Sequence, residues 1–328
     1  MYADTTLELV KKGASLLFLD VPQHTLLGID TQMFSVGPNF KGIKMIPPGP
    51  HFIYYSSSNR GGSEFSPMIG FFIDLNPSQV IVRKWDQQEE RLVKISEEEE
   101  ERYSQGVKNM EFDKYLGPYT LNQFGEWKML SNYITKTTIQ RIEPIGAEIT
   151  IIHEPDIFTS LLESILIKEY GGMEDFLLGE LQFAFVAFLM GQSLEAFLQW
   201  KNFVNLLFDC TEAPLHTRSN LFTKFIMVVY YQLKYAFQKE NNVATKGSIT
   251  LLDDSFLSSD SFLQHLCKEF FLLVLQAPFV DGDLLSWTRK LKELLESSLG
   301  WVFEHDMRDG IFYEDDDEFA PVVVMLEE

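Results

Sequence analysis

The spacing of the hydrophobic residues changes near Pro155, and this change constrains the fold more than any other feature of the sequence. Before it, short runs of β-branched and aromatic residues are separated by Pro, Gly and Asn, a pattern typical of strands. After it, apolar residues recur every three or four positions along helix-length segments. The sequence therefore predicts an α+β protein of two domains, an N-terminal antiparallel β-sandwich or barrel-like domain followed by an all-α domain.

The predicted β-rich domain covers residues 1–152. Its first strand is Leu16–Leu19, and its most distinct hairpin joins His51–Tyr55 to Met68–Leu75 through a turn rich in Gly and Asn. The segment Tyr119–Tyr133 has apolar residues at steps of three, which predicts a short amphipathic helix over one sheet face. A last strand is expected at residues 148–152.

Five consecutive glutamates follow Ser96. Serine is a good N-cap, and acidic residues are favourable near the positive end of a helix dipole, so a helix reaching Met110 is predicted. A run of like charges usually forms a solvated face, which is the favoured interpretation. The alternative is a surface that binds a basic partner.

The predicted helical domain covers residues 153–310, where Gly, Pro and Asn separate apolar segments of helix length. Its most hydrophobic segment is Leu178–Met190. Gly191–Glu195 carries a serine, Ser193, but lacks the second glycine of a hydrolase nucleophile turn, so it is interpreted as a helix–helix turn. Asp281–Asp283 is interpreted as a helix start with Asp283 as its cap.

The last segment, residues 311–328, combines an acidic spacer with a strand-like tail. Five consecutive acidic residues at 314–318 cannot enter a core, whereas the residues after them are mostly apolar and β-branched. Such a segment is expected either to dock on its own domain, to remain a loose end, or to add to the sheet edge of a partner. The candidate partner-binding residues are Phe319, Ala320, Pro321, Val322, Val323, Val324, Met325 and Leu326.

Composition limits the environment and the ligands. The 27 basic against 48 acidic residues give a net charge of −21, which disfavours direct binding to nucleic acid or anionic membranes. Only Cys210 and Cys267 occur, both in apolar segments, which indicates a reducing compartment. No signal-like start and no apolar run of roughly 18 residues is found. A soluble protein of the cytoplasm or nucleus is expected.

No pattern of catalytic, cofactor-binding or metal-binding residues emerges. Gly37–Gly42 has phosphate-loop glycines without the Lys and Ser or Thr that follow them, so a β-turn is expected. His153 lacks the second helical histidine of a zinc protease. The sequence predicts a non-enzymatic protein without cofactor. The alternatives are a hydrolase or small-ligand binder using His24 and His51 in a barrel mouth, and a generic acidic adaptor.

Three groups of residues together resemble the Aar-two (A1/alpha-two repression) splicing-factor family. The first comprises Gly28–Asp30, Val36–Phe52 and Gly70–Phe72; the second runs from Leu178–Val186 through Gly191 to Leu207; the third is the acidic spacer with Ala320–Val324. They occur in the family's order from near the start of the chain to its end. None of them is a catalytic motif.

The resemblance implies a helical domain of the superhelical VHS-like type and a role in assembling the U5 small nuclear ribonucleoprotein (U5 snRNP). The implied partner is the spliceosomal scaffold protein Prp-eight, bound through its RNase H-like and Jab1/MPN-like domains. Binding would keep the Brr-two helicase and RNA away during cytoplasmic assembly, until maturation in the nucleus. In this family the tail adds a strand that bridges the two scaffold domains, so Phe319–Leu326 become interface residues.

The same resemblance implies release by phosphorylation. Ser193 is the candidate site, because a phosphate beside Glu195 would disturb the local packing and the bound state. Relatives often carry a long insertion between the two domains, whereas here Ile142–Glu148 passes almost directly into the expected last strand.

Overall fold

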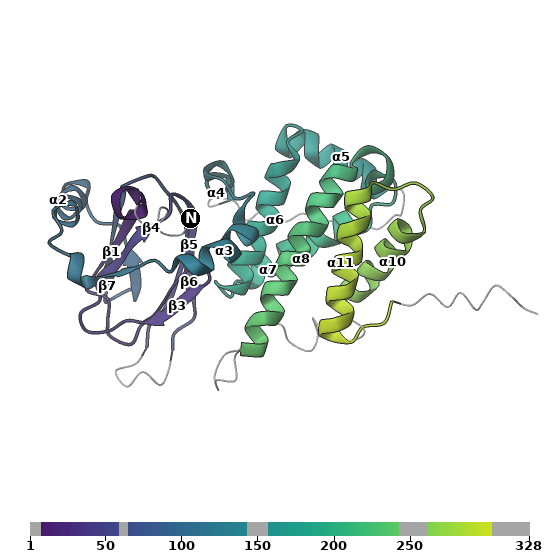
Figure 1. Ribbon diagram of the computed structural model, residues 1–328. Coiled ribbons are helices and arrows are strands. Elements are labelled where there is room, and N and C mark those ends of the chain that lie inside the picture. The colour runs from purple at the N-terminus through teal and green to yellow at the C-terminus, as the bar shows by residue number, and fades with distance from the viewer. Residues whose placement is uncertain (1–7, 59–64, 143–156, 243–261, 304–328) are drawn as a thin grey trace, which may run out of the picture.

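The structure is a computed structural model that describes residues 8–58, 65–142, 157–242 and 262–303. It contains a β-rich N-terminal part beside a helical C-terminal part (Figure 1). This arrangement confirms the prediction of a two-part α+β protein. The strand expected at 148–152, the predicted limits at residues 152 and 310, and the tail lie outside the described residues, so these stay predictions.

Within the described residues the strands form a five-stranded sheet of order β8-β7-β1-β4-β9 and a four-stranded sheet of order β3-β2-β5-β6. We call them the outer and the inner sheet. The strands are β1 Ala14–Leu19, β2 Leu26–Ile29, β3 Gln32–Ser35, β4 Gly42–Ile46, β5 Gly49–Ser56, β6 Ile69–Leu75, β7 Val80–Asp86, β8 Arg91–Val93 and β9 Leu116–Pro118. The predicted hairpin is β5 and β6, in which Phe52 lies opposite Phe72.

The two sheets differ in how their strands pair. The inner sheet is antiparallel throughout, as predicted. The outer sheet is mixed, because β1 runs parallel to β7 and β4 runs parallel to β9. Parallel pairs need long connections, and here the chain builds β5 and β6 of the inner sheet before it returns to the outer sheet. Spacing of the strands along the sequence did not indicate these returns.

Layering explains the continuous apolar run in β1. Leu16 and Phe18 belong to the core between the two sheets, whereas Leu17 and Leu19 belong to a smaller cluster on the other face of the outer sheet. Helix α2, Glu97–Lys108, covers that second cluster. A strand buried on both faces needs apolar side chains at every position.

Helix α2 begins as predicted. The Oγ of Ser96 accepts a hydrogen bond from the backbone N–H of Glu99, and acidic residues fill the first turn. Glu100 has an additional contact, since its carboxylate accepts a hydrogen bond from the N–H of Val82 in β7 at 3.0 Å. One of the five glutamates therefore ties the helix to the outer sheet.

Helices α3 and α4 lead from the sheets into the helical part (Figure 1). The described helices are α3 Phe124–Ser131, α4 Lys136–Ile142, α5 Ile157–Tyr170, α6 Glu174–Leu189, α7 Leu194–Phe208, α8 Ser219–Asn242, α10 Phe262–Gln276 and α11 Gly282–Leu299, with a π-helix at Ala213–Thr217. Helix α3 begins later than the predicted segment. It lies against the inner sheet, where the Trp127 indole N–H donates to the Pro50 carbonyl at 3.0 Å.

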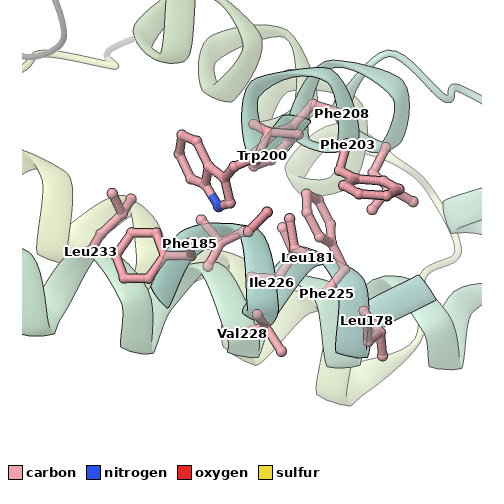
Figure 2. Close-up of a cluster of buried hydrophobic side chains, with 14 of the residues drawn as sticks. Leu178, Leu181, Phe185, Trp200, Phe203, Phe208, Phe225, Ile226, Val228 and Leu233 are labelled. Carbon is pink, nitrogen blue, oxygen red and sulfur yellow. The ribbon is translucent and has the colours of Figure 1, made fainter. Parts of the chain in front are cut away.

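The core of the helical part surrounds α6, which is apolar on all sides and buried over most of its length. Phe185 of α6 and Trp200 of α7 pack against each other, and Phe225 of α8 meets Phe208 of α7 with ring centroids 4.9 Å apart (Figure 2). Large aromatic side chains account for much of this core, and edge-to-face pairs stabilise such packing.

The cap of α11 differs from the expectation. The carboxylate of Asp281, rather than that of Asp283, accepts hydrogen bonds from the N–H groups of Asp283 and Leu284. Asp281 has the extended backbone of an N-cap, whereas Asp283 already lies inside the first turn. At the other end, Gly300 adopts φ 66°, the left-handed conformation that commonly ends a helix.

Candidate protein-interaction surface

His51, proposed from the sequence as a possible base, lies in a closed polar network. Its Nδ1 is 2.7 Å from Oδ2 of Asp30, and its Nε2 is 2.6 Å from the carbonyl oxygen of Pro47. Both partners are acceptors, so both ring nitrogens donate and the ring is an imidazolium. His51 and Asp30 are 1% and 0% exposed, so this is a buried ion pair.

The remaining lone pairs of Asp30 are also used. The Tyr119 hydroxyl donates to Oδ2 at 2.7 Å, and the N–H of Phe52 donates to Oδ1 at 3.0 Å. Burial lowers the pKa of His51, but the charge and hydrogen bonds of Asp30 and the Pro47 carbonyl outweigh it, and the net pKa is raised. Every polar group of the pair is satisfied inside the protein, so the network acts as structural support.

The structure gives no support to the sequence-based alternative of a hydrolase at these histidines. His24 is exposed while His51 is buried with both nitrogens engaged, so neither is placed as a base that could reach a substrate together with the other. No group of three potential metal ligands occurs among the described residues. Burial raises the pKa of the Cys210 thiol to about 12, so this cysteine is unreactive at neutral pH.

The inner sheet and the helical part share one apolar core. Phe72 of β6 stacks on Phe183 of α6, with ring centroids 4.2 Å apart. Gly191, directly after α6, is so close to the sheet that an added Cβ would meet the Phe52 ring at 3.0 Å. We call this contact region the junction. It holds the two parts in one arrangement, and any surface that spans them is therefore preformed.

Ser193 lies two residues beyond Gly191, at the N-cap of α7. Its Oγ accepts a hydrogen bond from the N–H of Ala196 at 3.2 Å, and the residue is half-buried. The helix–helix turn predicted at Gly191–Glu195 is confirmed. A phosphate on Oγ would lie at the positive end of α7, which favours it, and close to Glu195, which opposes it.

Two leucines that the sequence analysis did not single out follow Ser193. Leu194 and Leu198 are one helical turn apart on α7, and their exposed fractions are 70% and 53%. Ala196 and Trp200 of the same helix are buried. The signal was present in the sequence as an apolar pair on the opposite face from the buried residues. An exposed apolar pair beside the junction is a candidate contact for a protein partner.

None of the described helices combines the length and the apolarity that crossing a bilayer requires. The tail residues 319–326, predicted as the main partner-binding segment, lie outside the described residues. Among the described residues, the candidate contacts are therefore surfaces that suit proteins rather than pockets that suit small molecules.

Comparison with known proteins assigns the chain to a family. A family model for the AAR2 N-terminal domain matches residues 12–144, and a model for the AAR2 C-terminal repeat region matches residues 134–304. The chain belongs to the AAR2 family. The first AAR2 model spans both sheets, and the second spans the helices from α4 to α11.

Individual AAR2 proteins match over most of their length. The human protein AAR2 homolog is 28% identical, across 97% of this chain and 94% of the relative. The homolog from Caenorhabditis elegans is 27% identical, across 90% of this chain and 96% of the relative. The A1 cistron-splicing factor AAR2 of Saccharomyces cerevisiae is 24% identical, across 66% of this chain and 76% of the relative. The family resemblance predicted from the three residue groups is confirmed.

Proposed function

We propose that this chain is a pre-mRNA splicing assembly factor that binds the scaffold protein Prp-eight during U5 snRNP biogenesis. The observation that carries the proposal is the match to AAR2 proteins over nearly the whole chain, including a yeast relative that is named a splicing factor. While bound, the chain blocks premature binding of the Brr-two helicase and of RNA. It acts by occupying surfaces and has no reaction of its own.

Charge supports this role. A protein with a net charge of −21 repels RNA but is attracted to the basic surfaces that hold RNA. The exposed glutamates of α2 supply such negative charge on a capped, rigid helix. An acidic protein seated on a basic scaffold surface would therefore exclude RNA without resembling it. Association of this kind weakens with rising salt.

The tail supplies a second mode of contact in this proposal. Phe319–Leu326 adds as a strand to the sheets of the RNase H-like and Jab1/MPN-like domains and bridges them. Backbone hydrogen bonds would provide affinity, and alternating side chains would select the site. Binding begins in the cytoplasm, and release follows in the nucleus.

Phosphorylation of Ser193 is proposed as the release signal. The hydroxyl lies two residues from the junction, beside the exposed Leu194. A dianionic phosphate there would place new charge next to apolar contacts, which favours dissociation of a partner seated on them. A Ser193→Ala chain that is released from the scaffold at the normal rate in phosphorylating extract would remove this part of the proposal.

The test is a binding titration with a recombinant scaffold fragment that contains both domains. The full chain is compared with a chain that ends at Glu318, and with a full-length Val323→Pro chain. The proline removes one backbone donor and disrupts strand pairing while the tail keeps its length. We expect both changes to weaken binding, and the full chain to prevent the helicase from binding the same fragment.

The outcomes separate the parts of the proposal. Equal affinity of all three chains would move the interface to the folded parts and overturn the bridging strand. Absence of binding by the full chain would overturn the assignment of this partner. Simultaneous binding of the chain and the helicase would contradict the blocking role.

A further inference from the structure

A groove lies on the helical part where α7 and α10 end beside the π-helix. Its volume is about 600 Å³, within the range of surface sites that accept a few side chains. The lining residues are Phe208, Asp209, Thr211, Leu215, Glu269, Phe270, Leu272, Leu273, Gln276, Ala277 and Pro278. We call it the α7–α10 groove.

The walls and floor of the groove are mainly apolar. Phe208 and Phe270 are buried beneath it, with ring centroids 5.2 Å apart, so the floor is rigid. Leu215, Leu272 and Leu273 are partly exposed along it. Immediately after the lining residue Pro278, Phe279 is 88% exposed. An accessible aromatic ring beside an apolar groove is typical of protein-interaction sites.

The charge at the groove is negative. Its charged lining side chains are the carboxylates of Asp209 and Glu269. Helices α7 and α10 both end at the groove, at Phe208 and Gln276, and the C-terminal end of a helix carries partial negative charge on its last carbonyls.

The nearby basic groups do not cancel this charge. Lys268 is exposed on α10 but does not line the groove, and His216 is exposed on the π-helix beside the lining residue Leu215. Arg218, the residue after the π-helix, is held by Glu163 at 2.7 Å and by Glu174 at 2.9 Å. A ligand in the groove therefore faces apolar side chains with a negative rim.

We propose that the α7–α10 groove binds a peptide segment of a protein partner that combines apolar side chains with Lys or Arg. The apolar side chains fill the groove between Leu215 and Leu273, and the cation lies against Asp209 and Glu269. Charge complementarity selects this ligand over an acidic segment or a nucleic acid, which the carboxylates and helix ends repel. The site does not involve the tail and does not depend on the identity of the scaffold.

The proposal is tested on the full chain with short synthetic peptides. The probe carries two leucines one helical turn apart and two lysines beside them. One control peptide has glutamates in place of the lysines, and another has serines in place of the leucines. Affinity is measured by fluorescence anisotropy, and the site is located from NMR shifts of the leucine methyl groups.

The expected result is that the lysine peptide shifts the methyl signals of Leu215, Leu272 and Leu273. Two attractive charge pairs become two repulsive ones in the glutamate peptide, so its affinity should be about tenfold lower or less than that. The serine peptide should not bind. Methyl shifts confined to other leucines, or equal affinity for the lysine and glutamate peptides, would overturn the proposal.

Two charge reversals make the test specific. Glu269→Lys should weaken the lysine peptide and strengthen the glutamate peptide, whereas Glu293→Lys, an equally exposed change on α11, should alter neither. Thermal unfolding is measured for both variants, and Glu269→Gln replaces Glu269→Lys if the latter unfolds early. If changes at Glu269 leave the preference for lysine intact, the groove is not the binding site.

Discussion

Two buried rings illustrate how differently the two parts of this molecule are stabilised. His51 in the inner sheet is charged and donates from both nitrogens to Asp30 and Pro47. Trp200 in the helical part is neutral, is surrounded by apolar side chains, and donates one hydrogen bond to Gln232 at 2.9 Å. The first environment fixes a geometry through charge, and the second excludes water through area.

The difference shows where each part can tolerate change. A buried ion pair is costly to leave half-made, because the remaining charge has no water to solvate it. An apolar core loses stability in proportion to the contacts removed. The pair also sets the position of β5, since Asp30 holds the backbone N–H of Phe52, whose ring faces α6 across the junction.

The largest effect is expected from Asp30→Ala. It removes the acceptor for His51, Tyr119 and the Phe52 N–H and leaves a buried imidazolium unpaired. The free energy of unfolding, measured in urea, should fall by about 3–5 kcal/mol. Asp74→Ala, a half-buried carboxylate on the neighbouring strand, is the control and should cost about 1 kcal/mol or less. Equal losses in the two variants would mean that the pair has no special role.

The neutral counterpart is Trp200→Phe. The acceptor oxygen of Gln232 is then buried with no donor, which should lower the free energy of unfolding by about 1–3 kcal/mol. Adding Gln232→Met removes the unpaired amide and should restore part of the loss. If the double variant is less stable than Trp200→Phe alone, the hydrogen bond is not the cause of the loss, and the contrast with the ion pair fails.

The sequence could reveal the second environment but not the first. The apolar spacing of α6 to α11 appears in a single segment at a time, so the helices and much of their core could be predicted. The network joins Asp30, His51 and Tyr119 from three separate segments, and no local pattern signals their meeting. The same holds for the parallel pair β4 and β9, which depends on how the chain returns to the outer sheet.

The candidate interaction surfaces divide in the same way. Ser193 was identified because a turn between two apolar helices is a local signal, and the structure places it at a helix cap. The α7–α10 groove was not predicted, because its wall combines Phe208, Leu215 and Leu273 from three helices. A sequence shows which residues lie on one helix face, whereas a groove depends on which helix ends meet.

The junction can be tested with a single methyl group. In Gly191→Ala the new Cβ would lie 2.6 Å from the Ala187 carbonyl oxygen and 3.0 Å from the Phe52 ring, so the contact must open. We expect a loss of about 1–3 kcal/mol in thermal or urea unfolding. Gly125→Ala in α3, with nothing within 4 Å, should instead be neutral or stabilising. If both alanines behave alike, the junction is not tightly packed.

The charge of His51 predicts a pH dependence that Trp200 cannot produce. Because the folded pKa is raised above 6.5, the contribution of this site is complete below pH 6.5 and is lost as pH rises through the raised pKa. Each unit of the shift is worth about 1.4 kcal/mol. The stability difference between wild type and His51→Gln should therefore shrink on going to alkaline pH. A difference that grows with pH would show that the ring is neutral in the folded protein.

The smallest effect is expected at Arg218, where charge lies near the surface of the helical part. Its guanidinium is 28% exposed and contacts Glu163 through two nitrogens and Glu174 through a third. Lysine keeps the charge but cannot bind both carboxylates with the same geometry, so Arg218→Lys should cost about 1 kcal/mol or less and lose part of that effect in high salt. A loss as large as that of Asp30→Ala would mean that both parts depend on charge, because solvent would then fail to replace a partly exposed ion pair. A small, salt-sensitive loss would place the electrostatic stabilisation of the fold mainly beneath the inner sheet, next to the junction.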